Sequence, residues 1–263
     1  MVIDFHTHCF PDKIAARAME KLSTTSGLLP YTDGTVSGLL ALMEKDGVSA
    51  SVVLNIATNS GQQHAVNDFA ASIKSDTIIP FGSVHPESED VQEELERIAD
   101  LGLKGVKFHP EYQQFFVDDE KMKPIYKKIS RLGLICVFHA GEDYGFFPPY
   151  HATPARLEKA LSWLDSPVVA AHWGSQNMGQ EVLTHLCGKE IYFDISFGYG
   201  TAPKPIQQAI LEKHGTSKIL FASDCPWHAP SMELHQLGFL GLSKTEEAQI
   251  KYENACKLLN LSK

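Results

Sequence analysis

The sequence has no block of positive charge, no long apolar run and few cysteines. Its formal net charge is −9 over 263 residues, so a nucleic-acid partner would find no electrostatic attraction and is excluded. No apolar run approaches the length that crosses a bilayer, which excludes a membrane partner. The five cysteines form no Cys-x-x-Cys pair. With no signal peptide ahead of the first apolar run, these features predict a reduced, cytoplasmic protein.

A serine-nucleophile motif is also missing. The sequence contains no Gly-x-Ser-x-Gly elbow, so chemistry of the serine-hydrolase type is not expected. Cys9 follows His8 and Cys225 follows Asp224 in the sequence. For both cysteines the favoured interpretation is a small apolar residue that packs in the core. Catalysis, if present, must therefore come from other groups.

What the sequence does contain is a regular alternation of short apolar runs with segments of helical periodicity. Several runs are apolar at every position, as strands buried on both faces of a parallel sheet are. Eight such units in a chain of this size predict an α/β protein with a (β/α)₈ TIM barrel, and a doubly wound open sheet is the alternative. No repeat or linker divides the chain, so one domain is expected over residues 1–263. The predicted strands are residues 2–8, 50–57, 77–85, 102–109, 134–139, 167–172, 191–196 and 218–223.

Four helices are predicted from apolar spacing and from end signals. The helix that begins at Thr153 and Pro154 has threonine at the N-cap and proline in the first turn. The other three cover residues 11–22, 88–101 and 245–261.

Two histidines near the start of the chain share one face of a predicted strand. His6 and His8 lie in the stretch Asp4-Phe5-His6-Thr7-His8, and alternate side chains of a strand point the same way. Two imidazoles on a rigid face make half of a metal site. Two buried, hydrogen-bonded structural histidines are the alternative reading.

Further polar residues end later strands. They come from four different strands, and the carboxyl ends of the strands in such a barrel converge on one mouth. A mixed nitrogen and oxygen donor set suits Zn²⁺ first, with Mn²⁺, Fe²⁺ or Co²⁺ as alternatives. These residues are Lys107, His109, His139, His172 and Asp224.

Six short motifs spread over nearly the whole chain carry a family resemblance. They are DFHTHCF at residues 4–10, GVKFHPE at 105–111, FHAGED at 138–143, AHWG at 171–174, FASDCPW at 221–227 and ENACKLL at 253–259. Together they resemble the amidohydrolase superfamily. The closest likeness is to its branch of metal-dependent TIM-barrel hydrolases, which includes aminocarboxymuconate semialdehyde decarboxylase.

The resemblance implies a role for each polar residue. One divalent metal ion, Zn²⁺ first and Mn²⁺ second, would be held by His6, His8, His139 and Asp224. Asp224 would also carry protons, and His172 would orient or deprotonate the attacking water or hold a second metal.

Strand four leaves the number of metals open. The pattern Gly-x-Lys-x-His matches urease-like members, in which a carboxylated lysine bridges two metals and the following histidine contacts the substrate oxygen. This would give Lys107 and His109 catalytic roles. The whole-chain resemblance instead favours the branch that uses one ion.

The expected activity is hydrolysis of a small ester, lactone or amide by a metal-activated water. The alternatives are non-oxidative decarboxylation of a small unsaturated or aromatic acid, a phosphoesterase-type reaction, and a silent binding scaffold. Arginine, the usual partner of a carboxylate, is scarce after the strands that carry the site, which favours hydrolysis. A small-molecule substrate is expected, and a homo-oligomer is left open. Aromatic residues after several strand ends predict an aromatic-lined mouth: Phe10, Tyr144, Phe146, Phe147, Tyr150, Trp173, Phe197, Tyr199 and Trp227.

Overall fold

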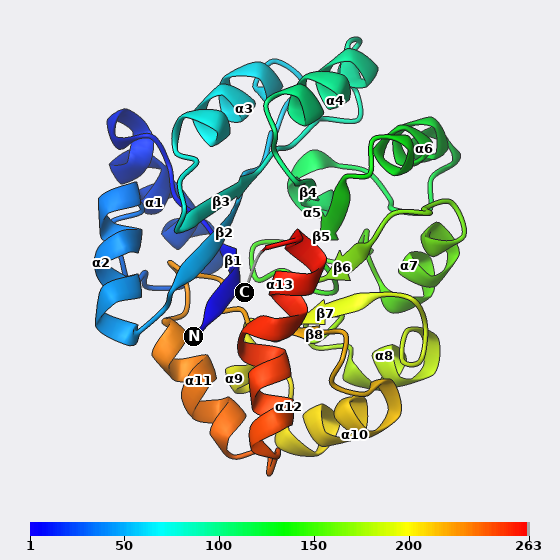
Figure 1. Ribbon diagram of the computed structural model, residues 1–263. Coiled ribbons are helices and arrows are strands. Elements are labelled where there is room, and N and C mark those ends of the chain that lie inside the picture. The colour runs from blue at the N-terminus through cyan, green and yellow to red at the C-terminus, as the bar shows by residue number, and fades with distance from the viewer. Residues whose placement is uncertain (262–263) are drawn as a thin grey trace.

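Eight short, almost wholly buried segments form parallel strands around which the helices make a ring (Figure 1). The structure is a computed structural model that describes residues 1–261. Each predicted apolar run contains one strand, so the eight-strand prediction is confirmed. The strands are shorter than the runs because the polar ends turn into loops. They are β1 (Ile3–Thr7), β2 (Ala50–Leu54), β3 (Ile78–Phe81), β4 (Gly105–Phe108), β5 (Ile135–Phe138), β6 (Val168–Ala170), β7 (Tyr192–Asp194) and β8 (Ile219–Leu220).

Neighbouring strands pair in chain order and the sheet closes on itself. Continuous parallel ladders join β1 to β3 and β4 to β8. Two isolated parallel bridges complete the circle, between Gly82 and Val106 and between Thr7 and Cys225. The predicted TIM barrel is therefore confirmed over the open sheet.

Helices cover the outside of the barrel between the strands, and each of the four segments predicted to be helical does contain helix. Thr153 does occupy the N-cap of α7, but its side chain makes no capping hydrogen bond. The C-terminal helix is interrupted by a π-helical turn at Gln249–Glu253. The α-helices are α1 (Asp12–Ser26), α2 (Val36–Asp46), α3 (Gln63–Ser72), α4 (Val91–Asp100), α5 (Pro110–Gln113), α6 (Lys123–Arg131), α7 (Pro154–Leu161), α8 (Gly179–His185), α9 (Gly198–Thr201), α10 (Lys204–His214), α11 (Pro230–Gly238), α12 (Lys244–Ala248) and α13 (Asn254–Leu259).

Apolar side chains fill the barrel and the layer outside it. Inside, Phe5 packs edge-on against Phe81, and residues of α13 such as Leu259 belong to the same cluster. Figure 1 shows α12 and α13 crossing one end of the barrel. The polar ends of the strands lie at the other end. Within residues 1–261 no helix is both long enough and apolar enough to cross a membrane.

A buried carboxylate joins the first strand to the segment after the last. Asp4 accepts hydrogen bonds from the Ser223 hydroxyl at 2.6 Å and from the backbone N–H groups of Ser223 and His6 at 3.0 and 3.2 Å. Burial raises the pKa of Asp4 to about 7, and these hydrogen bonds oppose the rise. Asp4 thus fixes β1 against the segment that carries Asp224.

Candidate metal centre

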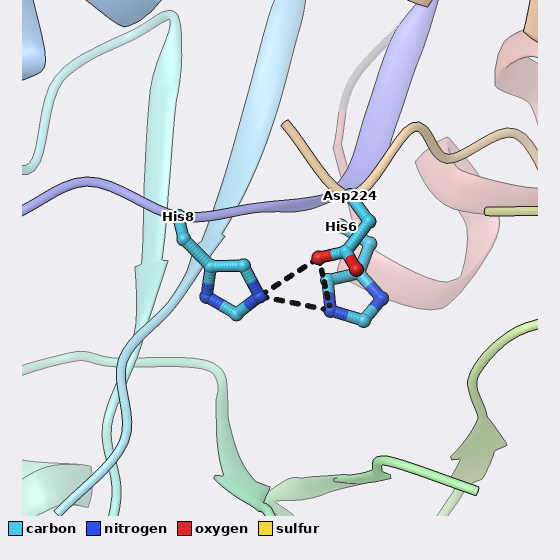
Figure 2. Close-up of side chains that lie close together, drawn as sticks. All are labelled: His6, His8 and Asp224. Carbon is cyan, nitrogen blue, oxygen red and sulfur yellow. Dashed lines mark hydrogen bonds and ion pairs between the residues drawn. The ribbon is translucent and has the colours of Figure 1, made fainter. Parts of the chain in front are cut away.

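His6, His8 and Asp224 bring three ligand atoms to one point at the mouth of the barrel (Figure 2). The two Nε2 atoms of the histidines lie 3.1 Å apart. Asp224 Oδ1 is 3.3 Å from His6 Nε2 and 3.0 Å from His8 Nε2. β1 carries a register shift between Asp4 and Thr7, a type of irregularity that often re-aims side chains next to functional sites.

Hydrogen bonds on the far side of each imidazole fix which nitrogen carries the proton. His6 Nδ1 is 2.8 Å from the Asp194 carboxylate, and His8 Nδ1 is 2.7 Å from the Leu54 carbonyl oxygen. Because these oxygens can only accept, both Nδ1 atoms donate. In the neutral rings the two Nε2 atoms therefore face each other with lone pairs.

The aspartate of this cluster has an oxygen without a hydrogen-bond partner. Asp224 Oδ1 is buried and receives no hydrogen bond from the described residues. Burial alone would raise the pKa of this carboxyl, but nearby His6 and His8 outweigh it and hold the pKa below its usual value. An anionic oxygen and two nitrogen lone pairs within reach of one another form a donor set that fits a divalent metal ion.

Backbone strain accompanies this arrangement. Asp224 and His172 both have positive φ angles, 66° and 61°, which residues other than glycine seldom adopt. The Asp224 N–H donates to the His6 carbonyl at 2.8 Å, which holds the strained turn against β1. Such strain is often stored at functional sites.

Asp194, at the end of β7, supports two histidines and was not predicted from the sequence. Besides accepting from His6, it accepts the backbone N–H of His172 at 3.0 Å. The Ser196 hydroxyl donates to Asp194, and it lies 2.9 Å from His172 Nδ1. Since the hydroxyl proton is used on Asp194, His172 Nδ1 donates to Ser196 and its Nε2 is left as a lone pair.

His139 lies beside His172 and His109, next to the three-residue cluster and not within it. Its Nδ1 is 3.0 Å from His172 Nε2, and its Nε2 is 3.1 Å from the Glu142 carbonyl oxygen. Its ring stacks on His109 at a centroid distance of 4.1 Å. With Asp143, these two rings form another group of closely spaced metal-ligand atoms. The role of His139 as a ligand of the same ion stays a prediction.

Asp143 is the second carboxylate that sequence reasoning missed. Its Oδ2 lies 3.3 Å from His109 Nε2. Although burial opposes it, the hydrogen bond and charge of His109 hold the pKa of Asp143 far below its ordinary value.

Lys107 points into the barrel and reaches the metal-ligand cluster. It is fully buried, and its amine donates to His6 Nε2 at 3.2 Å. Burial lowers the pKa of Lys107 from 10.5 to about 8, while the charges of Asp194 and Asp224 oppose the fall. A partly neutral amine beside metal ligands can act as a base, a hydrogen-bond donor or a site of carboxylation.

One cavity of about 820 Å³ opens over the metal-ligand cluster, Lys107 and Asp143, whereas Asp194 does not line it. All seven predicted site residues line it: His6, His8, Lys107, His109, His139, His172 and Asp224. Of the predicted aromatic mouth, Phe10, Tyr144, Phe197 and Trp227 line the cavity. Trp173 is buried elsewhere, and Phe147 is 90% exposed.

The cysteines at the site have no reactive character. Cys9 and Cys225 are buried, and burial raises the pKa of Cys9 to about 12. No cysteine forms a disulfide. This agrees with packing roles and not with a thiolate nucleophile.

Replacing Asp194 with asparagine is expected to weaken metal binding by about 10- to 100-fold without preventing folding. The amide keeps the shape of the carboxylate but cannot accept as strongly from His6, and such supporting partners typically have effects of this size. Competition with a fluorescent zinc chelator would measure the affinity. Asp165→Asn, on an exposed residue after α7, is the matched control and should bind metal like the wild type. An unchanged affinity for the Asp194 variant would remove it from the site.

Comparisons with known proteins agree with the barrel fold. The profile of the family described as Amidohydrolase matches residues 3–261. Among solved structures, an uncharacterised TIM-barrel protein from Bordetella bronchiseptica is 18% identical with a TM-score of 0.76, covering 99% of this chain and 98% of that one. 5-Carboxyvanillate decarboxylase from Sphingomonas paucimobilis is 15% identical with a TM-score of 0.71, covering 99% of both chains.

A third similar structure has a hydrolytic assignment. This protein from Pseudomonas putida, whose assignment as a 2-pyrone-4,6-dicarboxylic acid hydrolase is itself provisional, is 16% identical with a TM-score of 0.70 and covers 100% of this chain and 98% of its own. A search of curated proteins finds no match. At these identities the solved structures show a shared fold, whereas the profile covers nearly the whole sequence. The chain belongs to the amidohydrolase family.

Proposed function

We propose that this protein is a metal-dependent hydrolase that cleaves a small ester, lactone or amide with a water molecule. The observation that carries the proposal is the convergence of two imidazole lone pairs and an unpartnered carboxylate oxygen at the floor of a large cavity. His6, His8 and Asp224 would hold the ion, with His139 as a further ligand. A divalent metal supplies an electrophile and lowers the pKa of water to about 7.

Side chains at and beside the metal-ligand cluster would carry out the proton transfers and stabilise the charge on the substrate. Asp224 Oδ2, the oxygen not facing the two histidines, would accept a proton from the attacking water and return it to the leaving group. His172 is neutral, because burial lowers its pKa well below the ordinary value, and its Nε2 lone pair can orient or accept from the water. Lys107 and His109 would contact the substrate oxygen on which charge builds.

The absence of an arginine from the cavity favours hydrolysis over decarboxylation. Of the described residues that line the cavity, the cationic ones are Lys13, Lys21 and Lys107. Arg156, which lies on α7 after the strand that precedes His139, is engaged with Asp118 at 2.6 Å. A decarboxylase substrate would therefore have to rely on the metal and a lysine for its carboxylate.

Decarboxylation remains the second candidate because of the similar structures. These include 2,6-dihydroxybenzoate decarboxylase, solved with 2,6-dihydroxybenzoate. A probable 2-pyrone-4,6-dicarboxylic acid hydrolase of the same fold was solved with citric acid bound. A small carboxylic acid is therefore a reasonable ligand for this cavity as well. Lys107, as a proton donor beside the ligand cluster, would suit protonation of a carbanion-like carbon.

One experiment separates the two reactions. Zinc- and manganese-loaded protein is incubated with aryl esters, lactones including 2-pyrone-4,6-dicarboxylate, anilides, 5-carboxyvanillate and 2,6-dihydroxybenzoate. Acid release is followed in a pH-stat and CO₂ release by a coupled assay. We expect acid release from a lactone or ester, absent in a variant with alanine at both His6 and His8. Metal-dependent CO₂ release without any hydrolysis would reverse the assignment.

Metal content should be one ion per chain, and Lys107→Met should leave it at one. The expectation follows from the three-residue cluster, in which Lys107 acts on His6 through an ordinary amine. Elemental analysis after dialysis would measure the ratio, with and without bicarbonate during preparation. Two ions per chain, falling to one in the lysine variant, would instead support a carboxylated lysine that bridges two metals.

Stability of the metal-free protein should rise as the pH increases from about 8 to 10.5. The folded pKa of Lys107 lies below the unfolded one, so in this window the unfolded chain binds a proton that the folded chain does not. The full shift corresponds to about 3 kcal/mol. Urea unfolding in the presence of a chelator should show Lys107→Met more stable than the wild type at pH 7, with the difference shrinking toward pH 10. A constant difference would show that Lys107 does not titrate in this range.

A further inference from the structure

The cavity over the metal centre is much larger than a single-ring substrate requires. Its volume is about 820 Å³, whereas a cavity of about 150 Å³ already accommodates benzene. A small acid or lactone at the His6, His8 and Asp224 cluster would leave most of this space unfilled. The remaining lining residues indicate what else the cavity takes.

The additional space extends between α1 and α3, which Figure 1 shows on the same side of the barrel. On α1, Ile14, Ala18 and Leu22 line the cavity at a spacing of four residues, which places them on one helix face. On α3, Val66 and Phe69 line it from the facing wall. We call this apolar part of the cavity, defined by these five residues, the α1–α3 arm.

The apolar residues of α1 that line the arm differ from the apolar residues that pack the helix against the protein. Ala15 and Met19 are the buried residues of α1 and attach the helix to the protein. Ile14, by contrast, is 45% exposed although it is a large apolar side chain. Core packing therefore does not account for the stripe of Ile14, Ala18 and Leu22.

Charged groups lie only at the edge of the arm. The charged residues that line this part of the cavity are Lys13, Lys21 and Asp68, and all three are exposed. The metal-ligand cluster, at the ends of the strands, lines the same cavity. A molecule that fills the cavity would thus have a polar head at the metal and an uncharged tail along the arm.

We infer that the substrate is a two-part molecule, with a hydrolysable or acidic head and an apolar tail of alkyl or second-ring size that binds the α1–α3 arm. This inference rests on the proposed function for the position of the head. Val66, Ala18 and their neighbours in the arm then determine specificity, because they select tail length and bulk while the metal centre selects the head.

Straight-chain hydroxamic acids of two to ten carbons test the inference by calorimetry on the zinc-loaded protein. The hydroxamate head binds zinc, and each added methylene buries apolar surface in the arm. We expect affinity to increase about two- to fourfold per methylene until the arm is filled. Equal affinities across the series would overturn the inference.

Variants that fill the α1–α3 arm with a bulky side chain test whether the increase in affinity with chain length arises there. Ala18→Trp and Ala65→Trp fill the arm from α1 and α3, since both alanines line the cavity. Each should weaken the ten-carbon probe at least tenfold and the two-carbon probe less than twofold. Ala16→Trp, at an exposed position of α1 outside the cavity, is the matched control and should bind the whole series like the wild type. Equal losses in the control variant would contradict the assignment to the arm.

Failure of the metal centre would be recognised separately. If the two-carbon probe binds no better to the wild type than to the variant with alanine at His6 and His8, the proposed metal-dependent function fails. The dependence on chain length among the longer probes, and its loss in Ala18→Trp, would still decide whether the arm binds a tail.

Discussion

Purified protein in which His6 and His8 are both replaced by alanine is expected to contain no stoichiometric metal. The two Nε2 atoms lie 3.1 Å apart, and their Nδ1 atoms are already engaged with Asp194 and Leu54. Removing both rings leaves at most Asp224 and His139 of the proposed ligands, and two protein ligands do not hold a divalent ion tightly. Elemental analysis after equilibration with zinc and dialysis would measure the loss.

A double replacement elsewhere controls for the loss of two histidines. His64 pairs with Asp90 and Glu94, and His185 pairs with Glu158, all away from the cavity lining. Alanine at both positions should leave metal content unchanged. Full occupancy in the variant of His6 and His8 would show that the ion is held by other residues, and the group of His109, His139 and Asp143 would be the next to test.

Asp224→Asn should keep the fold and lose nearly all activity. Asparagine preserves the shape and tolerates the positive φ of 66° better than most residues, so the strained turn should survive. The amide cannot take up the proton of the water, and loss of general acid–base help typically costs about 10²–10⁴ in rate. Weaker metal binding adds to this loss, since a neutral amide replaces an anionic ligand.

The measurement is kcat/KM on the substrate found in the hydrolysis screen, with circular dichroism to check the fold. Asp165→Asn is a suitable control, because Asp165 is exposed and does not line the cavity. A variant of Asp224 within threefold of the wild type would mean that another residue, with His172 the first alternative, serves as the base.

The barrel was predictable because its strands are marked by composition. Apolar runs such as residues 168–171 are buried on both faces, and that requirement leaves a continuous apolar pattern in the sequence. The same runs place His109, His139 and His172 at strand ends, so their gathering at one mouth follows from the fold.

What the sequence did not reveal is the pairing of side chains across the mouth. Asp194 ends a strand and Asp143 follows one, but neither lies in a pattern that distinguishes a supporting carboxylate from a solvated one. Their partners, His6 and His109, are distant in the chain and meet them only through the tertiary structure. The grouping of His139 with His109 depends on loop geometry in the same way. The α1–α3 arm likewise arises from two helices whose apolar faces are ordinary when each is read alone.

The contact between Asp4 and Ser223 has a consequence for how an ion is acquired. These residues are 219 positions apart in sequence, and they join the strand of His6 and His8 to the segment of Asp224. During biosynthesis the histidine pair emerges early and is a weak two-nitrogen site until the eighth strand arrives. The complete ligand set exists only in a closed barrel, so ion uptake and ring closure favour each other. A chelator present during refolding should therefore slow or reduce recovery of the closed state, whereas the same chelator added later should act only as fast as the barrel opens.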